Sequence, residues 1–351
     1  MIAASAPPTD DERLRLWLSY LVAGRGSLGD VDDAFAGMLL RRRLAPLAVF
    51  HGARHALLAG VERQAFVSGV AGENTARRTL DILADAGVPA VCHKGPPLAV
   101  LAWGDPTLRA CVDVDLLLPG QHLARALRAL EAEGVTAASP YPRWYERLWH
   151  AHVAVRGAGS PTVELHHNFT RPWLARFDFA DLAREAREVS CAAQTLPSPS
   201  PAWQLVLVAA HATQHFFDVR GLLDMALLGT KLSDDEWRQA HDIARRTGVG
   251  PALVLAVSVS AGWLDWRPPA FVGASEVGEV RRRIVRAYAA RYAPTDPLRR
   301  GRLQFGKLVA PMATASGWRW LPAVLMALTD RPNVATAVDA RWRAQRGATK
   351  R

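Results

Sequence analysis

The stretch Val88–Leu118 reads VPAVCHKGPPLAVLAWGDPTLRACVDVDLLL, and its final part decides the fold that we expect. Residues 112–118 predict a strand, because they are apolar except for two aspartates. Side chains on a strand alternate between its faces, so Asp113 and Asp115 share one face, roughly 7 Å apart along the backbone. Two adjacent carboxylates repel each other unless a cation lies between them, and oxygen ligands suit Mg²⁺. The pair therefore predicts a magnesium site.

Two basic residues precede this strand. The dipeptide Lys94-Gly95 joins an expected strand at 88–94 to a short helix at 96–103. Glycine lets a ligand approach the backbone, and a helix N-terminus beside a lysine favours phosphate, although the same residues could form only a tight turn. Arg109 directly precedes the Asp-x-Asp strand. Its guanidinium could hold a triphosphate with two hydrogen bonds or neutralise the two aspartates.

A third carboxylate follows in the run Thr162–His167. Glu164 and His166 alternate with apolar residues, so they share one face of an expected strand. If this strand lies beside the Asp-x-Asp strand, Glu164 completes a set of three carboxylates. Such a set around two Mg²⁺ ions would polarise a phosphate, stabilise its leaving group and help to deprotonate an attacking hydroxyl.

Short motifs spread over about residues 80–230 carry a resemblance. They are Lys94-Gly95, Asp105-Pro106, Arg109, Asp113–Leu117 and Val163–His166, with looser similarity at Leu205, His211, His215 and Leu222–Asp224. In these motifs the chain resembles the uncharacterised nucleotidyltransferase family of the polymerase-β-type superfamily. That family has members in bacterial natural-product clusters, including lasso-peptide clusters.

The resemblance implies roles for these residues. Asp113 and Asp115 would bind the catalytic Mg²⁺ ions, and Glu164 would be the third carboxylate. Lys94-Gly95 would take the place of the superfamily's Gly-Gly/Ser nucleotide loop. The chain departs from that loop at Pro96, which replaces an N–H donor, and we expect Lys94 to compensate.

Two histidines in a later helix remain open to interpretation. His211 and His215 are four residues apart and therefore share a helix face. They could face the acceptor or the phosphate cleft, serve as structural residues, or bind zinc, although no metalloprotease glutamate accompanies them. Asp224 could orient one of them or cap a helix. We interpret His150 and His152 as structural.

Hydrophobic spacing places these motifs in an α+β fold, with a small sheet-containing core flanked by helical regions. The resemblance implies that this core is the small mixed sheet of the polymerase-β-type superfamily. The core should hold strands at 88–94, 112–118, 149–156 and 161–167, helices at 96–103 and 120–133, and a turn at 157–160. We expect an N-terminal helical region at 1–85, a nucleotidyltransferase core at 86–170, a Pro/Ser-rich connector at 171–201, a C-terminal helical domain at 202–345 and a basic tail at 346–351.

Composition narrows the setting. The chain has 351 residues, a formal net charge of +10 and three cysteines without a CxxC pair. An odd, unpaired cysteine set suits a reducing cytoplasm. The N-terminus lacks the pattern of a signal peptide, and the longest apolar run, 251–264, is too short to span a bilayer, so we expect no membrane partner. Many arginines fall in 281–302 and 341–351, where they indicate a solvated helical surface. They permit nucleic acid binding without favouring it.

We therefore expect a cytoplasmic, Mg²⁺-dependent nucleotidyltransferase. It would move a nucleoside monophosphate from an NTP such as ATP to a hydroxyl or phosphate acceptor, which could be a peptide or another natural product, and release pyrophosphate. The phosphate-binding residues would be Lys94, Gly95, Arg109, His166, His211 and His215. The alternatives are a catalytically inactive scaffold of the same fold that binds a peptide, and a basic nucleic-acid-associated factor.

Overall fold

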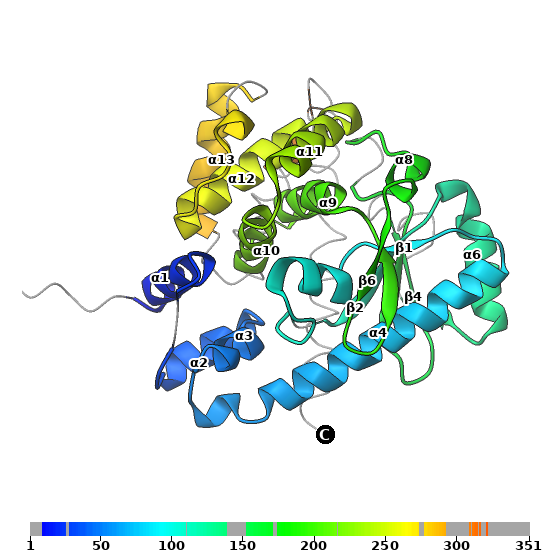
Figure 1. The fold of residues 1–351 in the computed structure, drawn as a ribbon, viewed down its shortest axis with the longest axis horizontal. Coiled ribbons are helices and arrows are strands. Elements are labelled where there is room, and N and C mark those ends of the chain that lie inside the picture. Colours follow the sequence, from blue (N-terminus) through cyan, green and yellow to red (C-terminus); the bar gives the residue numbers. More distant parts are fainter. Residues whose placement is uncertain are drawn as a thin grey trace, which may run out of the picture.

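The computed structural model describes residues 9–25, 28–109, 111–138, 152–170, 174–215, 217–273 and 277–292, with a few positions between 309 and 321. His150 and the expected tail at 346–351 lie outside these residues. A small mixed sheet lies beside helices from both ends of the chain (Figure 1), which confirms the expected α+β class. Among the described residues, no helix combines the length and apolar character needed to cross a membrane.

The sheet has the strand order β1-β2-β5-β4-β3. Strands β2 and β5 are parallel, and the other neighbours are antiparallel. The strand expected at 88–94 is shortened to two residues, and β3 has no counterpart among the expected strands. The bounds are β1 (Val91–Cys92), β2 (Asp113–Leu117), β3 (Thr136–Ala137), β4 (His152–Arg156) and β5 (Thr162–His166).

Twelve described α-helices accompany this sheet. The first begins at Asp10, and the residue before it, Thr9, forms the capping box with Glu12 that the sequence indicates. The helices are α1 (Asp10–Val22), α2 (Asp33–Arg41), α3 (Ala45–Phe50), α4 (Val61–Asp85), α5 (Pro96–Leu98), α6 (Leu123–Ala132), α8 (Phe179–Ala183), α9 (Pro201–Gln214), α10 (Val219–Gly229), α11 (Asp234–Thr247), α12 (Gly250–Leu264) and α13 (Glu279–Tyr292). Helix α5 continues into a π-helical turn at Ala99–Trp103, so the expected helix at 96–103 is present in two forms.

The two faces of the sheet differ in polarity. On one face Val114 and Leu116 of β2 pack with Val163 and Leu165 of β5, and α4 and α6 cover them. Figure 1 shows the long helix α4 running along the sheet. Because strand side chains alternate, the residues between these four must project from the opposite face. Those residues include both aspartates of β2 and the polar residues of β5.

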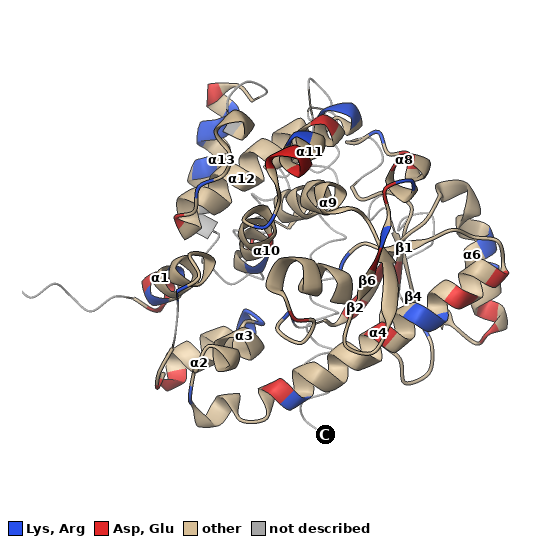
Figure 2. Ribbon diagram, in the orientation of Figure 1, with Lys and Arg blue, Asp and Glu red and all other residues tan. Residues whose placement is uncertain are grey.

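Helices from the two ends of the chain share a second hydrophobic core. Leu14 and Leu18 of α1 belong to the same buried cluster as Leu222 of α10 and Leu253 of α12. Helix α12 contains no charged residue and appears entirely tan in Figure 2, in keeping with its central position between α9, α10 and α1. The described N-terminal and C-terminal helices thus pack against each other as well as against the sheet.

The segment expected as a connector contains regular structure. Strands β6 (Arg187–Ser190) and β7 (Thr195–Ser198) form an antiparallel ribbon, which includes part of the Pro/Ser-rich run. The ribbon is fixed to α4 by Glu73, a fully buried carboxylate that accepts hydrogen bonds from three successive backbone N–H groups, those of residues 192–194. These bonds satisfy a charge that would be costly to bury alone.

Helix α13 carries most of the described part of the arginine-rich segment, visible as blue bands in Figure 2. Several of these arginines bind groups within the chain. Arg281 donates to the Met312 carbonyl, Arg282 and Arg283 pair with Glu279, and Arg286 donates to Ser258. Their charges are therefore used at least partly to hold α13 against its neighbours.

Candidate active site

Three carboxylates meet on the polar face of the sheet. Strand β5 lies beside β2 in parallel, with Glu164 directly across from Asp115 and Thr162 across from Asp113. The sequence predicted a set of three carboxylates on the condition that these two strands are neighbours. That condition is met, because parallel pairing in this register places residues of the same face side by side. Asp115 is buried, whereas Asp113 and Glu164 are partly exposed. The three carboxylates therefore form one acidic group, with Asp115 as its most buried member.

Asp115 is the most heavily contacted of the three. Its Oδ1 accepts hydrogen bonds from Lys94 Nζ at 3.1 Å and from His166 Nε2 at 2.8 Å. Burial by itself would raise the pKa of Asp115, but the positive charge of Lys94 and the hydrogen bond from His166 outweigh it and hold that pKa well below its usual range. Asp115 therefore stays ionised, and the Lys94 ammonium lies directly at the carboxylates.

The pKa values of the other two carboxylates are shifted in opposite directions. Burial and the negative charges of Asp115 and Glu164 raise the pKa of Asp113 to about 6. Burial also acts on Glu164, but a hydrogen bond from His166 and the charge of His152 lower its pKa to about 2. The repulsion within the group is therefore concentrated at Asp113. A divalent cation with oxygen ligands would relieve that repulsion, so this set of donors fits Mg²⁺.

The loop before α5 depends on its glycine. Gly95 has φ 63° and ψ −134°, a conformation that residues with a side chain rarely adopt. A Cβ at this position would lie 3.4 Å from Cys111 Sγ and 3.8 Å from the Asp113 carbonyl oxygen. The backbone at Gly95 therefore packs against residues 111–113, at the start of the Asp-x-Asp strand.

We expect Gly95→Ala to destabilise the protein by about 1–3 kcal/mol, because it forces a β-carbon into this backbone region. Chemical denaturation measures the change. Gly134→Ala is the matched control, since Gly134 also has a positive φ of 74° but no atom within 4 Å of the new methyl group. A loss well below about 1 kcal/mol in Gly95→Ala would show that the backbone conformation of Gly95 imposes no strain on a residue with a side chain.

Arg109 points to a partner that the sequence did not suggest. Its Nε and Nη2 donate to the two carboxylate oxygens of Asp224 on α10, each at 2.9 Å, and Trp103 Nε1 donates to the same carboxylate at 2.7 Å. Arg109 and Asp224 are both buried. The structure thus places the guanidinium on Asp224 rather than on the aspartate pair, and Asp224 lies within α10 rather than at its cap. This ion pair joins the segment before β2 to the C-terminal helices.

His211 and His215 lie at the end of α9, with ring centroids 4.0 Å apart. Burial and the positive charge of Lys94 lower the pKa of His211 well below its usual value, whereas His215 is exposed. The His211 imidazole is therefore neutral at pH 7. Among the described residues, neither belongs to a group of three metal-ligand atoms, so the zinc alternative gains no support there.

Two further histidines, His93 and His152, lie at the site, although the sequence did not predict them there. His93 directly follows β1, and its backbone N–H donates to the Asp115 carbonyl at 3.1 Å. His152, which we interpreted as structural, has its Nε2 3.7 Å from Glu164 Oε2. The position of His152 could have been predicted from the expected turn at 157–160. That turn makes β4 and β5 an antiparallel pair, in which His152 lies opposite His166. No local signal marked His93, since its position depends on the pairing of β1 with β2.

Comparisons with known proteins place the chain in a family. The profile of a family described as "Uncharacterised nucleotidyltransferase" matches residues 39–265. Among solved structures, the antibiotic-resistance factor ANT(2'')-Ia is similar at 12% sequence identity and a TM-score of 0.34, covering 48% of this chain and 88% of its own. No curated protein matched the sequence.

Proposed function

The chain belongs to the uncharacterised nucleotidyltransferase family, and on that premise we propose that it transfers a nucleoside monophosphate from an NTP to a hydroxyl or phosphate acceptor, dependent on Mg²⁺. The observation that carries this proposal is the parallel pairing of β2 with β5, which sets Glu164 beside Asp115 on the face that also bears Asp113. Clustered carboxylates of this kind are what two-metal phosphoryl transfer requires.

In the proposed reaction, an acceptor oxygen forms a bond to the α-phosphorus of the NTP. The bond from that phosphorus to its bridging oxygen breaks, and pyrophosphate leaves with the electron pair. Asp113, Asp115 and Glu164 would hold the divalent cations, which supply charge neutralisation for the phosphates. Glu164 would assist removal of the acceptor's proton.

The remaining residues are proposed to bind and orient phosphate. Lys94 contributes a positive charge, and Gly95 permits the φ of 63° that shapes the loop before α5. His166 is fixed by Asp115 and Glu164. We propose that His211, being neutral, can donate one ring N–H, and that His215, whose ring lies 4.0 Å from that of His211, also contributes to phosphate binding. For Arg109 we propose a positioning role, because its ion pair with Asp224 holds α10 against the segment before β2.

The acceptor and setting complete the proposal. The resemblance to members of natural-product clusters makes a peptide or another natural product our first choice of acceptor. The three described cysteines are free thiols, which suits a reducing cytoplasm that also supplies ATP and Mg²⁺.

The test incubates the purified protein with Mg²⁺, each of the four NTPs and candidate acceptors. Mass spectrometry should detect an acceptor that has gained one nucleoside monophosphate, and a coupled assay should detect an equal amount of pyrophosphate. Removal of the metal with EDTA should stop both. Hydrolysis of NTP to NDP and phosphate, with no nucleotide on any acceptor, would contradict the proposal.

One observation favours a second candidate, a scaffold of the same fold that binds a peptide without catalysis. Lys94 and His166 already neutralise Asp115 from within the chain, so this carboxylate has cationic partners without a metal. For such a scaffold, equilibrium dialysis should show peptide binding but no binding of NTP with Mg²⁺. Binding of NTP that requires the metal would exclude it.

A further inference from the structure

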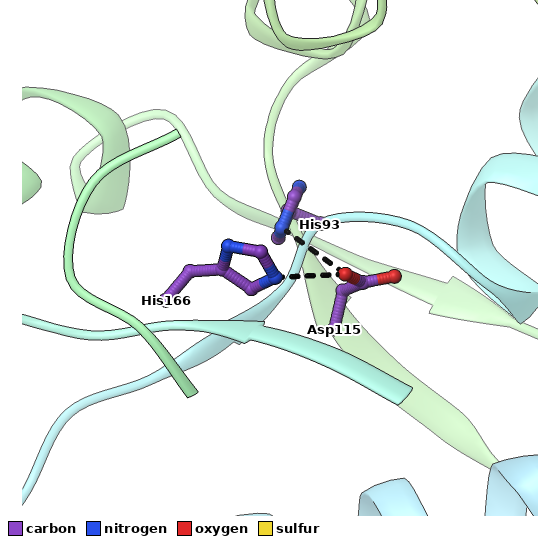
Figure 3. A group of neighbouring side chains, drawn as sticks. All are labelled: His93, Asp115 and His166. Atoms are coloured by element: carbon purple, nitrogen blue, oxygen red, sulfur yellow. Dashed lines mark hydrogen bonds and ion pairs between the residues drawn. The ribbon is translucent and has the colours of Figure 1, made fainter. Parts of the chain in front are cut away.

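The polar face of the sheet holds nitrogen ligands as well as carboxylates. His93 Nε2 lies 4.0 Å and His166 Nε2 lies 2.8 Å from the same atom, Asp115 Oδ1. Figure 3 shows both imidazole rings directed at this carboxylate from different sides. The two rings meet edge to face, with centroids 4.8 Å apart and an interplanar angle of 86°. Three candidate ligand atoms therefore lie within 4.8 Å of one another.

His93 supplies a second and independent observation. Its side chain is only 2% exposed, and among the described residues neither ring nitrogen has a hydrogen-bond partner. Buried polar atoms are nearly always satisfied, so an imidazole enclosed in this way and directed at a carboxylate calls for a missing partner. A metal ion between the ring and Asp115 would satisfy it.

The spacing and ligand types indicate which ion would fit. Bonds of about 2.0–2.1 Å in a tetrahedral shell put neighbouring ligand atoms about 3.3 Å apart, between the two separations seen here. Two imidazoles and one carboxylate form a set that suits Zn²⁺ and similar ions, whereas Mg²⁺ prefers oxygen alone. Glu164 Oε2 lies 3.4 Å from His166 Nε2, but it groups with His152 and His166 rather than with His93 and Asp115.

We propose that His93, Asp115 and His166 form a binding site for Zn²⁺ or a similar transition-metal ion, tighter than the binding of Mg²⁺ by the nucleotide-free protein. The inference rests on the proposed function only in assigning Asp115 to both sites. Because the two sites share this carboxylate, a bound Zn²⁺ would change the coordination available to Mg²⁺. The metal that is present therefore regulates the proposed reaction.

The Lys94 ammonium competes with a metal ion for Asp115. Its ammonium lies 3.1 Å from Asp115 Oδ1, the oxygen that the ion would use. A cation so close repels a divalent ion, and metal binding requires Lys94 to move away from this oxygen. The Lys94 side chain is long and not fully buried, with 13% of its surface exposed, so the proposed site requires it to turn toward this exposed side.

The test measures Zn²⁺ affinity of the full chain without nucleotide, by competition with a chromophoric chelator, and follows Co²⁺ substitution by visible absorption. We expect one Zn²⁺ per chain, bound at least about 10³-fold more tightly than Mg²⁺. His93→Ala should weaken binding by at least about 100-fold. His152→Ala is the comparison variant, because His152 belongs with Glu164 and His166 to a neighbouring group of candidate ligands. Its loss of affinity should not exceed about tenfold, and a loss as large as that of His93→Ala would place the ion in that group instead.

Lys94→Met should increase Zn²⁺ affinity by about tenfold or more. A gain in affinity cannot result from misfolding, which would only weaken binding. Equal affinities for Zn²⁺ and Mg²⁺, or equal losses in His93→Ala and His152→Ala, would overturn the inference. Since no nucleotide is present, these results are independent of transfer. Zn²⁺ binding without NMP transfer would contradict the proposed function alone, and transfer without Zn²⁺ binding would contradict this inference alone.

Discussion

Asp113→Asn should lower the rate of NMP transfer by about 10³-fold or more, while the protein remains folded. The change removes one negative charge from the proposed metal site and keeps the size of the side chain. Asp113 is the position where the repulsion within the carboxylate group is concentrated, so it should depend most on a bound cation. Initial rates of pyrophosphate release with saturating Mg²⁺ and NTP measure the effect.

The same variant should be more stable than the wild type when no metal is bound. The pKa of Asp113 is raised to about 6 from a usual value of 3.8, so folding disfavours its charged form. The wild type should therefore lose stability as the pH rises from about 4 through about 6, and Asp113→Asn should lack that loss. At pH 8 in EDTA the variant should melt a few degrees higher.

Asp81→Asn is the control for both effects, since Asp81 lies on the exposed side of α4 and pairs with Arg77. It should leave rate and melting temperature close to the wild type. An Asp113→Asn protein that keeps more than about a tenth of the wild-type rate would remove Asp113 from the catalytic carboxylates.

Asp224→Ala should destabilise the protein by about 3–5 kcal/mol, the largest effect on stability that we expect. Asp224 accepts two hydrogen bonds from Arg109 and a third from Trp103, and all three side chains are buried. Removing the carboxylate leaves a buried guanidinium without its counter-charge. The loss is measured by chemical denaturation at pH 7.

Two controls separate this buried pair from ordinary ion pairs. Asp235→Ala breaks an exposed pair with Arg238 and should cost no more than about 1 kcal/mol. The double variant Arg109→Met with Asp224→Leu should recover much of the stability, because an apolar pair leaves no buried charge. A loss below about 1 kcal/mol for Asp224→Ala would show that the pair does not hold α10 against the segment before β2.

The carboxylate arrangement was within reach of the sequence because it depends on local periodicity. Alternation along 112–118 and 161–167 fixed which side chains share a face, and the register of β2 with β5 then brought Glu164 to Asp115. The short turn between β4 and β5 was equally local. These features could be predicted without knowledge of distant parts of the chain. The exception is the pairing of β2 with β5, which could be stated from the sequence only as a condition.

The contacts that were not predictable join distant positions. Asp224 is 115 residues from Arg109, and an arginine beside two aspartates gave no reason to look for a partner so far away. His93 reaches the site only because β1 pairs with β2, and a strand of two residues leaves little periodicity to read. The ribbon of β6 and β7 was also missed, because prolines and serines dominate its second strand and favour loops in isolation.

The central claim is that Asp113, Asp115 and Glu164 together bind divalent cations at the phosphates of an NTP. Its most direct test is a crystal structure of the protein with Mn²⁺ and a non-hydrolysable NTP analogue, in which anomalous scattering locates the metal. We expect Mn²⁺ between these carboxylates and the triphosphate, with Lys94 near the phosphates. An NTP bound elsewhere, or Mn²⁺ held by the triphosphate without contact to Asp113 or Glu164, would contradict the claim.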